Sequence, residues 1–474
     1  MTSTFFKLTA MTAATLVLAG CASVNFDQAV KHANQTTGSF TDGKLALSRN
    51  AEQNDARAKL AADLLSKPLS PDDAVQLALA NSPAVQTMLA QSWADMSAAD
   101  QAGRIANPIF KFERITFKDE LELGRILSFG LLDVLTLPRR QAIAQSRIAQ
   151  SQVQLSASVV ELVTQVRQAW VRAVAASQTL QYAEQINTTA EASAELAKRM
   201  QQVGNFNKLQ RARQQVFYAD STARLAAAQH GALAAREELV RQLGLTDAQA
   251  AQLKLPDRLP DLPKEASAPS QVSRVALEQR LDVQLARSQL DTAGKAQGLN
   301  LLTSLVDVEL GIVRSTTFDN GGGAGRAFAK RGYELGIRLP IFDWGDARRD
   351  AMNAQSLAAA NRYESTVRSA TSQLRESYSA YRTAYDVARH YRDEVVPLRK
   401  TMAEENVLRY NGMLIGVFEL LADTRDQISS VVTAINAYQQ FWLADAALRA
   451  SMTGKPTTMM MAAPAAGGIP APAH

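Results

Sequence analysis

Two stretches of this chain are so long and so free of helix breakers that each must form a very long helix. Residues 139–202 contain no proline or glycine, and neither do residues 346–395. Alanine, glutamine, arginine, leucine and glutamate dominate, and all of them favour helix. At 1.5 Å per residue the first stretch would be about 95 Å long. No globular core needs a helix of that length, so the sequence predicts an extended, mainly α-helical fold.

Apolar residues recur along both stretches at coiled-coil spacing, which requires partner helices. Each long helix is therefore expected to turn back as a hairpin, at Gly204 in the first case and near Gly412 to Gly416 in the second. Pro397 is expected to kink or locally break the second helix. The two stripes are Val159, Val163, Val166, Trp170 and Val174, and Leu374, Tyr378, Tyr381, Tyr385 and Ala388.

The chain carries an internal duplication. Three landmarks recur in order at offsets of about 198 to 208 residues: a helix start, a Leu-Pro pair and a hairpin turn. The first repeat is assigned to residues 71–255, with strands in 107–131 and a helical hairpin in 139–243. The second is assigned to residues 271–454, with strands in 303–340 and a hairpin in 346–452. The remaining segments are a signal peptide (1–20), an N-terminal anchor (21–70), a Pro-rich linker (256–270) and a low-complexity tail (455–474).

Short alternating runs precede each predicted hairpin, for example Leu121, Leu123 and Leu127, or Leu335 and Ile337, with polar residues or glycine between them. The strand pairs are expected to join through residues 118–120 and through a long loop over 315–332. Strands of about ten residues with one apolar face suit a membrane barrel; two soluble β-hairpins are the alternative. Four strands cannot close a barrel, and lipid tolerates no open sheet edge, so several chains would share one.

The amino terminus indicates export and lipid attachment. An apolar run of about eleven residues, too short to span a bilayer, ends in Leu18-Ala19-Gly20-Cys21. Small residues before a cysteine resemble a lipobox, in which Cys21 would carry the lipid after cleavage at residue 20. Ala22 in place of an aspartate favours the outer membrane. An ordinary signal peptide with a chance cysteine is the alternative.

Composition argues against several other functions. A net charge of +5 with 51 basic and 46 acidic residues gives no strong basic surface for nucleic acid. One cysteine and four scattered histidines offer no metal-ligand spacing. The glycine run at 321–325 lacks a P-loop lysine, and nothing assembles a catalytic triad. We expect no enzyme, no cofactor and no metal site, although the Met-containing tail leaves soft-metal binding open as an alternative to disorder.

Taken together, residues 78–83 (ALANSP), 339–345 (LPIFDWG), 409–412 (RYNG) and 418–423 (FELLAD), with the duplication, resemble the TolC-like outer-membrane factor (outer membrane efflux protein) family, lipoprotein branch. The resemblance implies a homotrimer with a long periplasmic α-barrel and a shared twelve-stranded outer-membrane β-barrel. It also implies a passive duct for efflux or type I secretion that works with a periplasmic adaptor and an inner-membrane transporter. A periplasmic coiled-coil tether without a pore is the alternative function.

The resemblance further implies a gate at the periplasmic end. Glu419 matches the first of two family positions whose acidic rings constrict the channel. The second position falls on Ala422, with Asp423 beside it, and Tyr410 falls where a family tyrosine latches the closed end. Solvated helix surface for the two carboxylates, and ordinary helix packing for Tyr410, are the alternatives.

Overall fold

The computed structural model describes residues 25–41, 43–118, 120–266, 280–303, 307–319, 326–338, 341–342 and 344–454. These form two compact units whose segments interleave along the sequence. The sheet unit comprises Met1–Ala29, Gln91–Gln154 and Gln284–Thr366, and the hairpin unit comprises Val30–Ala90, Leu155–Val283 and Val367–His474. Cys21 and the tail beyond residue 454 lie outside the described residues.

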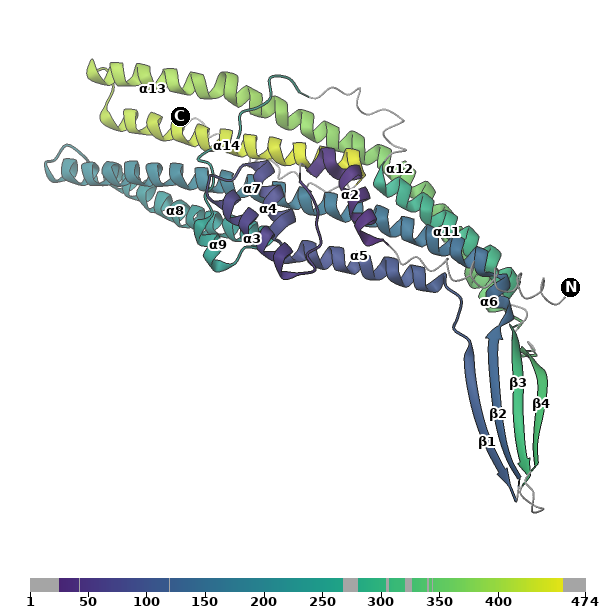
Figure 1. Cartoon of the computed structure of the whole chain (residues 1–474). Coiled ribbons are helices and arrows are strands. Elements are labelled where there is room, and N and C mark those ends of the chain that lie inside the picture. The colour runs from purple at the N-terminus through teal and green to yellow at the C-terminus, as the bar shows by residue number, and fades with distance from the viewer. Residues whose placement is uncertain are drawn as a thin grey trace. The chain divides into compact units, whose positions relative to one another are not determined.

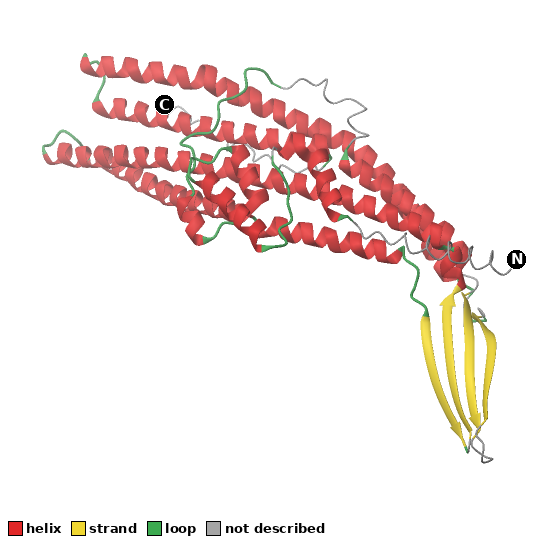
Figure 2. Ribbon diagram, viewed as in Figure 1, coloured by secondary structure: helices red, strands yellow, loops and turns green. Residues whose placement is uncertain are grey.

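The described residues are mainly helical, and their strands form one antiparallel sheet in the order β1-β2-β3-β4 (Figures 1 and 2). The strands are β1 (Ile109–Phe117), β2 (Glu120–Gly130), β3 (Asp307–Asp319) and β4 (Arg326–Arg338). The helices are α2 (Phe26–Thr41), α3 (Ala51–Leu65), α4 (Pro71–Asn81), α5 (Pro83–Ala102), α6 (Leu131–Leu135), α7 (Leu137–Gln202), α8 (Lys208–Leu243), α9 (Asp247–Gln252), α11 (Leu281–Thr303), α12 (Asp346–His390), the π-helix η2 (Tyr391–Val395), α13 (Val396–Asn411) and α14 (Val417–Thr453).

The element order confirms the predicted duplication and fold class. A helix, a strand pair, a long helix and a returning helix appear first as α5, β1, β2, α7 and α8. They appear again as α11, β3, β4, α12 to α13, and α14. The expected long loop over residues 315–332 is wrong, because β3 continues to Asp319 and β4 resumes at Arg326. Those residues pair with each other and with β2, as Thr316 does with Ala329 and Leu123, so hydrogen bonding carries the strands past the point where the apolar alternation fades.

The two returning helices end in the same way. Gly244 and Gly454 cap α8 and α14 in the left-handed conformation, with φ of +64° and +96°. A Cβ atom at Gly244 would lie 2.7 Å from Ser82 Cα, and one at Gly454 would lie 2.5 Å from Leu281 N. Each half therefore closes its returning helix against the start of its own α5 or α11, and only glycine fits both the backbone conformation and the contact.

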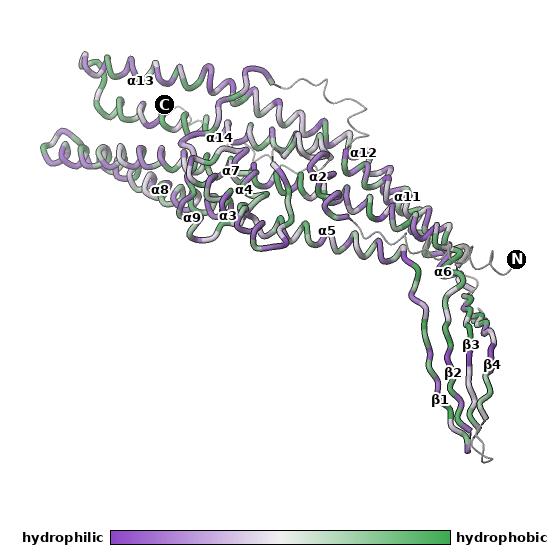
Figure 3. The backbone as a smooth tube through the Cα atoms, viewed as in Figure 1, coloured by the Kyte–Doolittle hydropathy of each residue, from purple (hydrophilic) through white to green (hydrophobic). Residues whose placement is uncertain are grey.

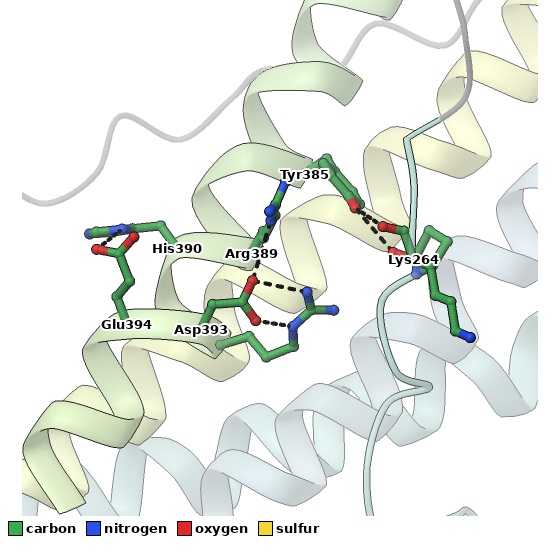
Figure 4. Close-up of polar contacts among 8 residues, drawn as sticks. Lys264, Tyr385, Arg389, His390, Asp393 and Glu394 are labelled. Carbon is green, nitrogen blue, oxygen red and sulfur yellow. Dashed lines mark hydrogen bonds and ion pairs between the residues drawn. The ribbon is translucent and has the colours of Figure 1, made fainter. Parts of the chain in front are cut away.

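The predicted apolar stripes form the cores of the hairpin unit. Val159, Val163, Val166 and Val174 are fully buried, and buried Trp170 donates from Nε1 to the Leu69 carbonyl at 2.8 Å. In the second half, Tyr381, Tyr385 and Phe441 pack together with ring centroids 5.5 and 5.7 Å apart. The linker crosses this cluster and is bound to it by Tyr385 Oη, which donates to the Lys264 carbonyl at 3.0 Å (Figure 4).

A π-helix interrupts the second long helix just before Pro397, where the sequence predicts a kink or break. The wider turn of η2 accommodates the proline, which has no backbone N–H to donate. Arg392 binds the Asp393 carboxylate through Nε at 2.6 Å and Nη2 at 3.1 Å, and Arg389 approaches from the preceding turn at 3.3 Å (Figure 4). The hydrogen bond from Arg392 holds the pKa of the Asp393 carboxyl below its usual value.

The sheet separates its side chains by face. In the observed register, Phe110 lies opposite Leu127, Leu127 opposite Ile312, and Ile312 opposite Tyr333. Directly opposed residues of antiparallel strands share one face, so Leu123, Leu127, Leu335 and Ile337 all lie on the same side. The alternation is visible as mixed apolar and polar colour along each strand (Figure 3). We call this side the apolar face and the other, which carries Lys111, Glu113, Glu122, Glu309, Lys330 and Glu334, the polar face.

Candidate functional site at the hairpin ends

The first hairpin turns over residues 203–207. Gly204 has φ of +84°, and its N–H donates to Gln201, while the N–H of Asn205 donates to the Met200 carbonyl at 2.9 Å. Asn207 then caps α8 through a reciprocal capping box with Gln210. Gly204 thus lies in the turn, and a Cβ there would meet nothing within 4 Å, so glycine is favoured for its backbone conformation alone.

The second hairpin turns at a different residue from the glycines that the sequence suggests. Gly412 follows α13 with φ of −80°, an ordinary value, and the left-handed residue is Met413 with φ of +59°. The N–H of Leu414 donates to the Arg409 carbonyl at 2.8 Å, and Gly416 precedes α14 without a side-chain cap. Gly412 and Gly416 therefore flank the turn, while its strained position is a methionine that is 94% exposed.

The three residues expected at a gate occupy different surroundings. Glu419 is exposed in the first turn of α14, where a negative charge is favourable at the amino end of the helix. Asp423 is half-buried and accepts a hydrogen bond from Asn406 Nδ2 on α13. Tyr410 is 40% exposed, and its hydroxyl has no hydrogen-bond partner within the described part of the chain. The structure therefore turns Asp423 toward its own hairpin and leaves Glu419 and Tyr410 available to solvent or to another chain.

Two ring contacts join the described residues of the two hairpins near their ends. The rings of Phe206, in the first turn, and Phe418, in α14, lie 4.4 Å apart, and the Arg425 guanidinium lies 5.2 Å from the Phe217 ring centre. Between α7, α8 and α14 there is a cavity of about 520 Å³ lined by both charges, among them Arg213, Asp220, Arg224, Arg425 and Asp426. An aromatic pair and a charged cavity hold two elements together far less firmly than a continuous apolar core.

Several of these features were missed from the sequence. No sequence motif marks Asn406, and its contact with Asp423 depends on how α13 and α14 pair. Phe206 and Phe418 each stand beside a predicted turn, but no local pattern indicates that the two turns meet. Met413 was missed because a non-glycine residue rarely adopts positive φ next to an available glycine. The capping pair Asn207 and Gln210, by contrast, has the spacing of a capping box and could have been recognised.

Among the described residues no group of three or more histidine, cysteine, aspartate or glutamate side chains is placed to hold a metal ion. No described helix combines the length and the apolar character needed to cross a bilayer.

Comparison with known proteins shows which proteins share this architecture. The family model for outer membrane efflux proteins matches residues 272–404, which run from the end of the linker through α11, β3, β4 and α12 into α13. This segment is therefore similar to outer membrane efflux proteins. No curated protein matches the sequence at a significant level.

Solved structures of outer membrane proteins share the fold of this chain over most of its length. The Campylobacter jejuni CmeC outer membrane channel superposes with a TM-score of 0.65 at 15% identity, covering 85% of this chain and 86% of that one. The Vibrio cholerae outer membrane protein VceC gives 0.64 at 15% identity, covering 81% and 96%. The open state of the Neisseria gonorrhoeae MtrE outer membrane channel gives 0.62 at 18% identity, covering 82% and 91%.

The two turns provide a reciprocal test of backbone strain. Met413→Gly should stabilise the second turn by about 0.5–1 kcal/mol, because it removes the left-handed strain and sacrifices almost no contact. Gly204→Ala should destabilise the first turn by about 1 kcal/mol for the opposite reason. Amide hydrogen exchange of residues 203–207 and 412–416 measures both. Faster exchange in Met413→Gly would show that the second turn is not held in the conformation described.

Proposed function

We propose that this protein is the outer-membrane duct of a tripartite export system, through which substrates pass passively from an inner-membrane transporter to the outside. The observation that carries the proposal is the sheet. It has one apolar and one polar face, and its outer strands β1 and β4 each have one edge with no partner strand among the described residues. Efflux and type I protein secretion are the two export routes that fit. The family match and the shared fold support the duct.

The open edges support a shared barrel. Lipid offers no hydrogen-bond partner to an unpaired strand edge, so a membrane-spanning sheet must close on itself. Four strands are too few, whereas three copies would pair β4 of one chain with β1 of the next and give twelve strands. The homotrimer would also surround one axis with six long helical hairpins, because each chain contributes two. Such an α-barrel would form the periplasmic part of the duct.

The partners follow from what the duct itself does not supply. We infer that energy comes from an inner-membrane transporter and that a periplasmic adaptor joins it to the hairpin ends. The exposed apolar residues Val203, Met413 and Leu414 at these ends are consistent with a partner there. A periplasmic tether without a pore is the competing function, but a tether does not need strands with an apolar face.

A pair of adjacent substitutions tests the membrane barrel. Leu335→Arg places a charge on the apolar face and should cost about 2–4 kcal/mol, as arginine does near the middle of a membrane. Gly336→Arg places the same charge on the polar face opposite Glu309, where a Cβ has room at 3.7 Å. We expect only Leu335→Arg to lose the trimer that migrates as one band in SDS without boiling. Equal trimer yields from the two variants would contradict a barrel in this register.

The hairpin ends would form the gate of this duct. We propose that Glu419 of three chains forms a ring of carboxylates, with Asp423 one turn further along α14. Clustered carboxylates attract cations and repel anions. Asp423 is already bound to Asn406, so it would mainly fix α13 against α14. The Tyr410 hydroxyl, which has no hydrogen-bond partner among the described residues, would latch the closed end to a neighbouring chain.

Planar-bilayer recording tests the gate. Glu419→Gln should lower the preference for cations and the block by divalent cations, because it removes three charges from the axis and keeps the side-chain shape. Asp423→Asn should change selectivity less, since the Asp423 carboxylate is already engaged by Asn406 of its own chain. Tyr410→Phe should raise the open probability by removing the hydroxyl alone. Unchanged cation selectivity in Glu419→Gln would show that the carboxylates lie on a solvated outer surface.

The lipid anchor at Cys21 is a separate proposal that rests on the lipobox-like sequence before it. Cys21→Ser should abolish incorporation of radiolabelled palmitate, because serine has no thiol to carry the thioether lipid. The apolar run before it is unchanged, so export should continue. Labelling of the mutant at the wild-type level would refute the assignment.

A further inference from the structure

A row of arginines crosses the apolar face of the sheet. Arg125 on β2 lies directly opposite Arg314 on β3, and Arg314 lies directly opposite Arg331 on β4. Arg114 on β1 pairs with Leu123, which places it on the same face one row nearer the turns. Neighbouring strands are about 4.8 Å apart. The Cα atoms of Arg125 and Arg331, at the two ends of the row, are therefore about 10 Å apart.

Charge on this sheet is sorted by face. All acidic side chains that the structure describes on the four strands lie on the polar face: Glu113, Glu120, Glu122, Glu309 and Glu334. The four arginines are the charged side chains described on the apolar face, where their neighbours are leucine, isoleucine, valine, phenylalanine, tyrosine, alanine and threonine. The row is thus a positively charged patch on a face that is otherwise uncharged and mainly apolar.

Among the described residues, these arginines have no carboxylate as a counter-charge. All four are exposed, and no described carboxylate forms a salt bridge with any of them, whereas Lys330 on the polar face lies 3.8 Å from Glu122. Like charges directly opposite each other on a sheet destabilise it. The arrangement is therefore unfavourable unless an anion from outside the chain lies among the guanidinium groups.

The position of the row along the strands indicates the source of that anion. Ile337 is six residues from Arg331 along β4, which corresponds to about 14 Å of height for a strand tilted by about 45°. Ile341, Phe342 and Trp344, which follow β4 in the sequence, are also exposed apolar residues. The row therefore lies in the half of the apolar band nearer the strand turns, on the side away from α6.

We propose that this row binds the phosphate groups of a polyphosphorylated glycolipid of the lipid A type in the outer leaflet. The inference rests on the proposed function, because it requires the apolar face to meet the outer membrane. Guanidinium groups bind phosphate oxygens in pairs of hydrogen bonds, and three in a row match a headgroup with more than one phosphate. The apolar rows below, with Leu127, Ile312 and Tyr333, would contact its acyl chains.

The experiment measures binding of bis-phosphorylated lipid A to the full-length trimer in detergent by native mass spectrometry. Arg125→Gln with Arg314→Gln should raise the dissociation constant about tenfold or more, as expected for lost charge-assisted hydrogen bonds. Arg331→Gln alone should raise it by about threefold, and serves if the double variant yields no trimer. Lys111→Gln with Lys330→Gln removes two positive charges from the polar face and should leave binding unchanged.

Two further arms identify the ligand. Dephosphorylated lipid A should bind the wild type as weakly as the double variant binds the intact lipid. Inorganic phosphate at the concentration of the lipid should not displace it. Equal binding by wild type and double variant, or displacement by inorganic phosphate, would overturn the inference.

Insertion is measured separately, as conductance in planar bilayers and as the unboiled trimer band. A trimer that conducts but binds lipid A independently of these arginines overturns the lipid site and leaves the duct intact. A wild-type chain that neither conducts nor forms the trimer overturns both.

Discussion

The constraint on which this structure depends is the length of one uninterrupted helix. Helix α7 runs for 66 residues, about 100 Å, and its backbone satisfies its own hydrogen bonds throughout. The helix cannot by itself bury the apolar side chains of its stripe, from Val159 to Val174. Helices and connections from distant parts of the chain cover that stripe. The bond from Trp170 to the Leu69 carbonyl, and that from the Leu69 N–H to the Lys254 carbonyl at 2.9 Å, tie three such segments together.

The sequence predicts most where a periodic pattern extends over many residues. The stripes on α7 and α12 are buried as predicted, and the alternation along β2 and β4 places Leu123, Leu127, Leu335 and Ile337 on one face. Prediction fails where the structure of a segment depends on residues that are distant in the sequence. Residues 315–332 lack apolar alternation, yet most of them are strand, because residues 315–319 pair with β2 and residues 326–332 pair with β3. At the candidate gate, Asp423 was expected to act with Glu419, but it binds Asn406, a contact that only helix pairing creates.

The two halves of the duplication have diverged in stiffness. The first long helix has no break, whereas the second contains η2 and Pro397. Beyond η2, α13 has no buried residues, while α12 before it is held by Tyr381, Tyr385 and the linker. Bending is easiest where regular hydrogen bonding is interrupted and packing is thin. The hairpin that carries Tyr410, Glu419 and Asp423 is therefore the more deformable of the two.

The open edges of the sheet also set an order of events for biogenesis. The hairpin unit buries apolar cores within a single chain. The described sheet instead has an outer edge of unpaired backbone on β1 and on β4, beside exposed Phe110, Phe112 and Tyr333, a combination that aggregates readily. In the proposed trimer, chains would therefore have to meet before or while their strands enter the lipid. Formation of that trimer should consequently depend on the concentration of chains and on factors that shield the strands before assembly.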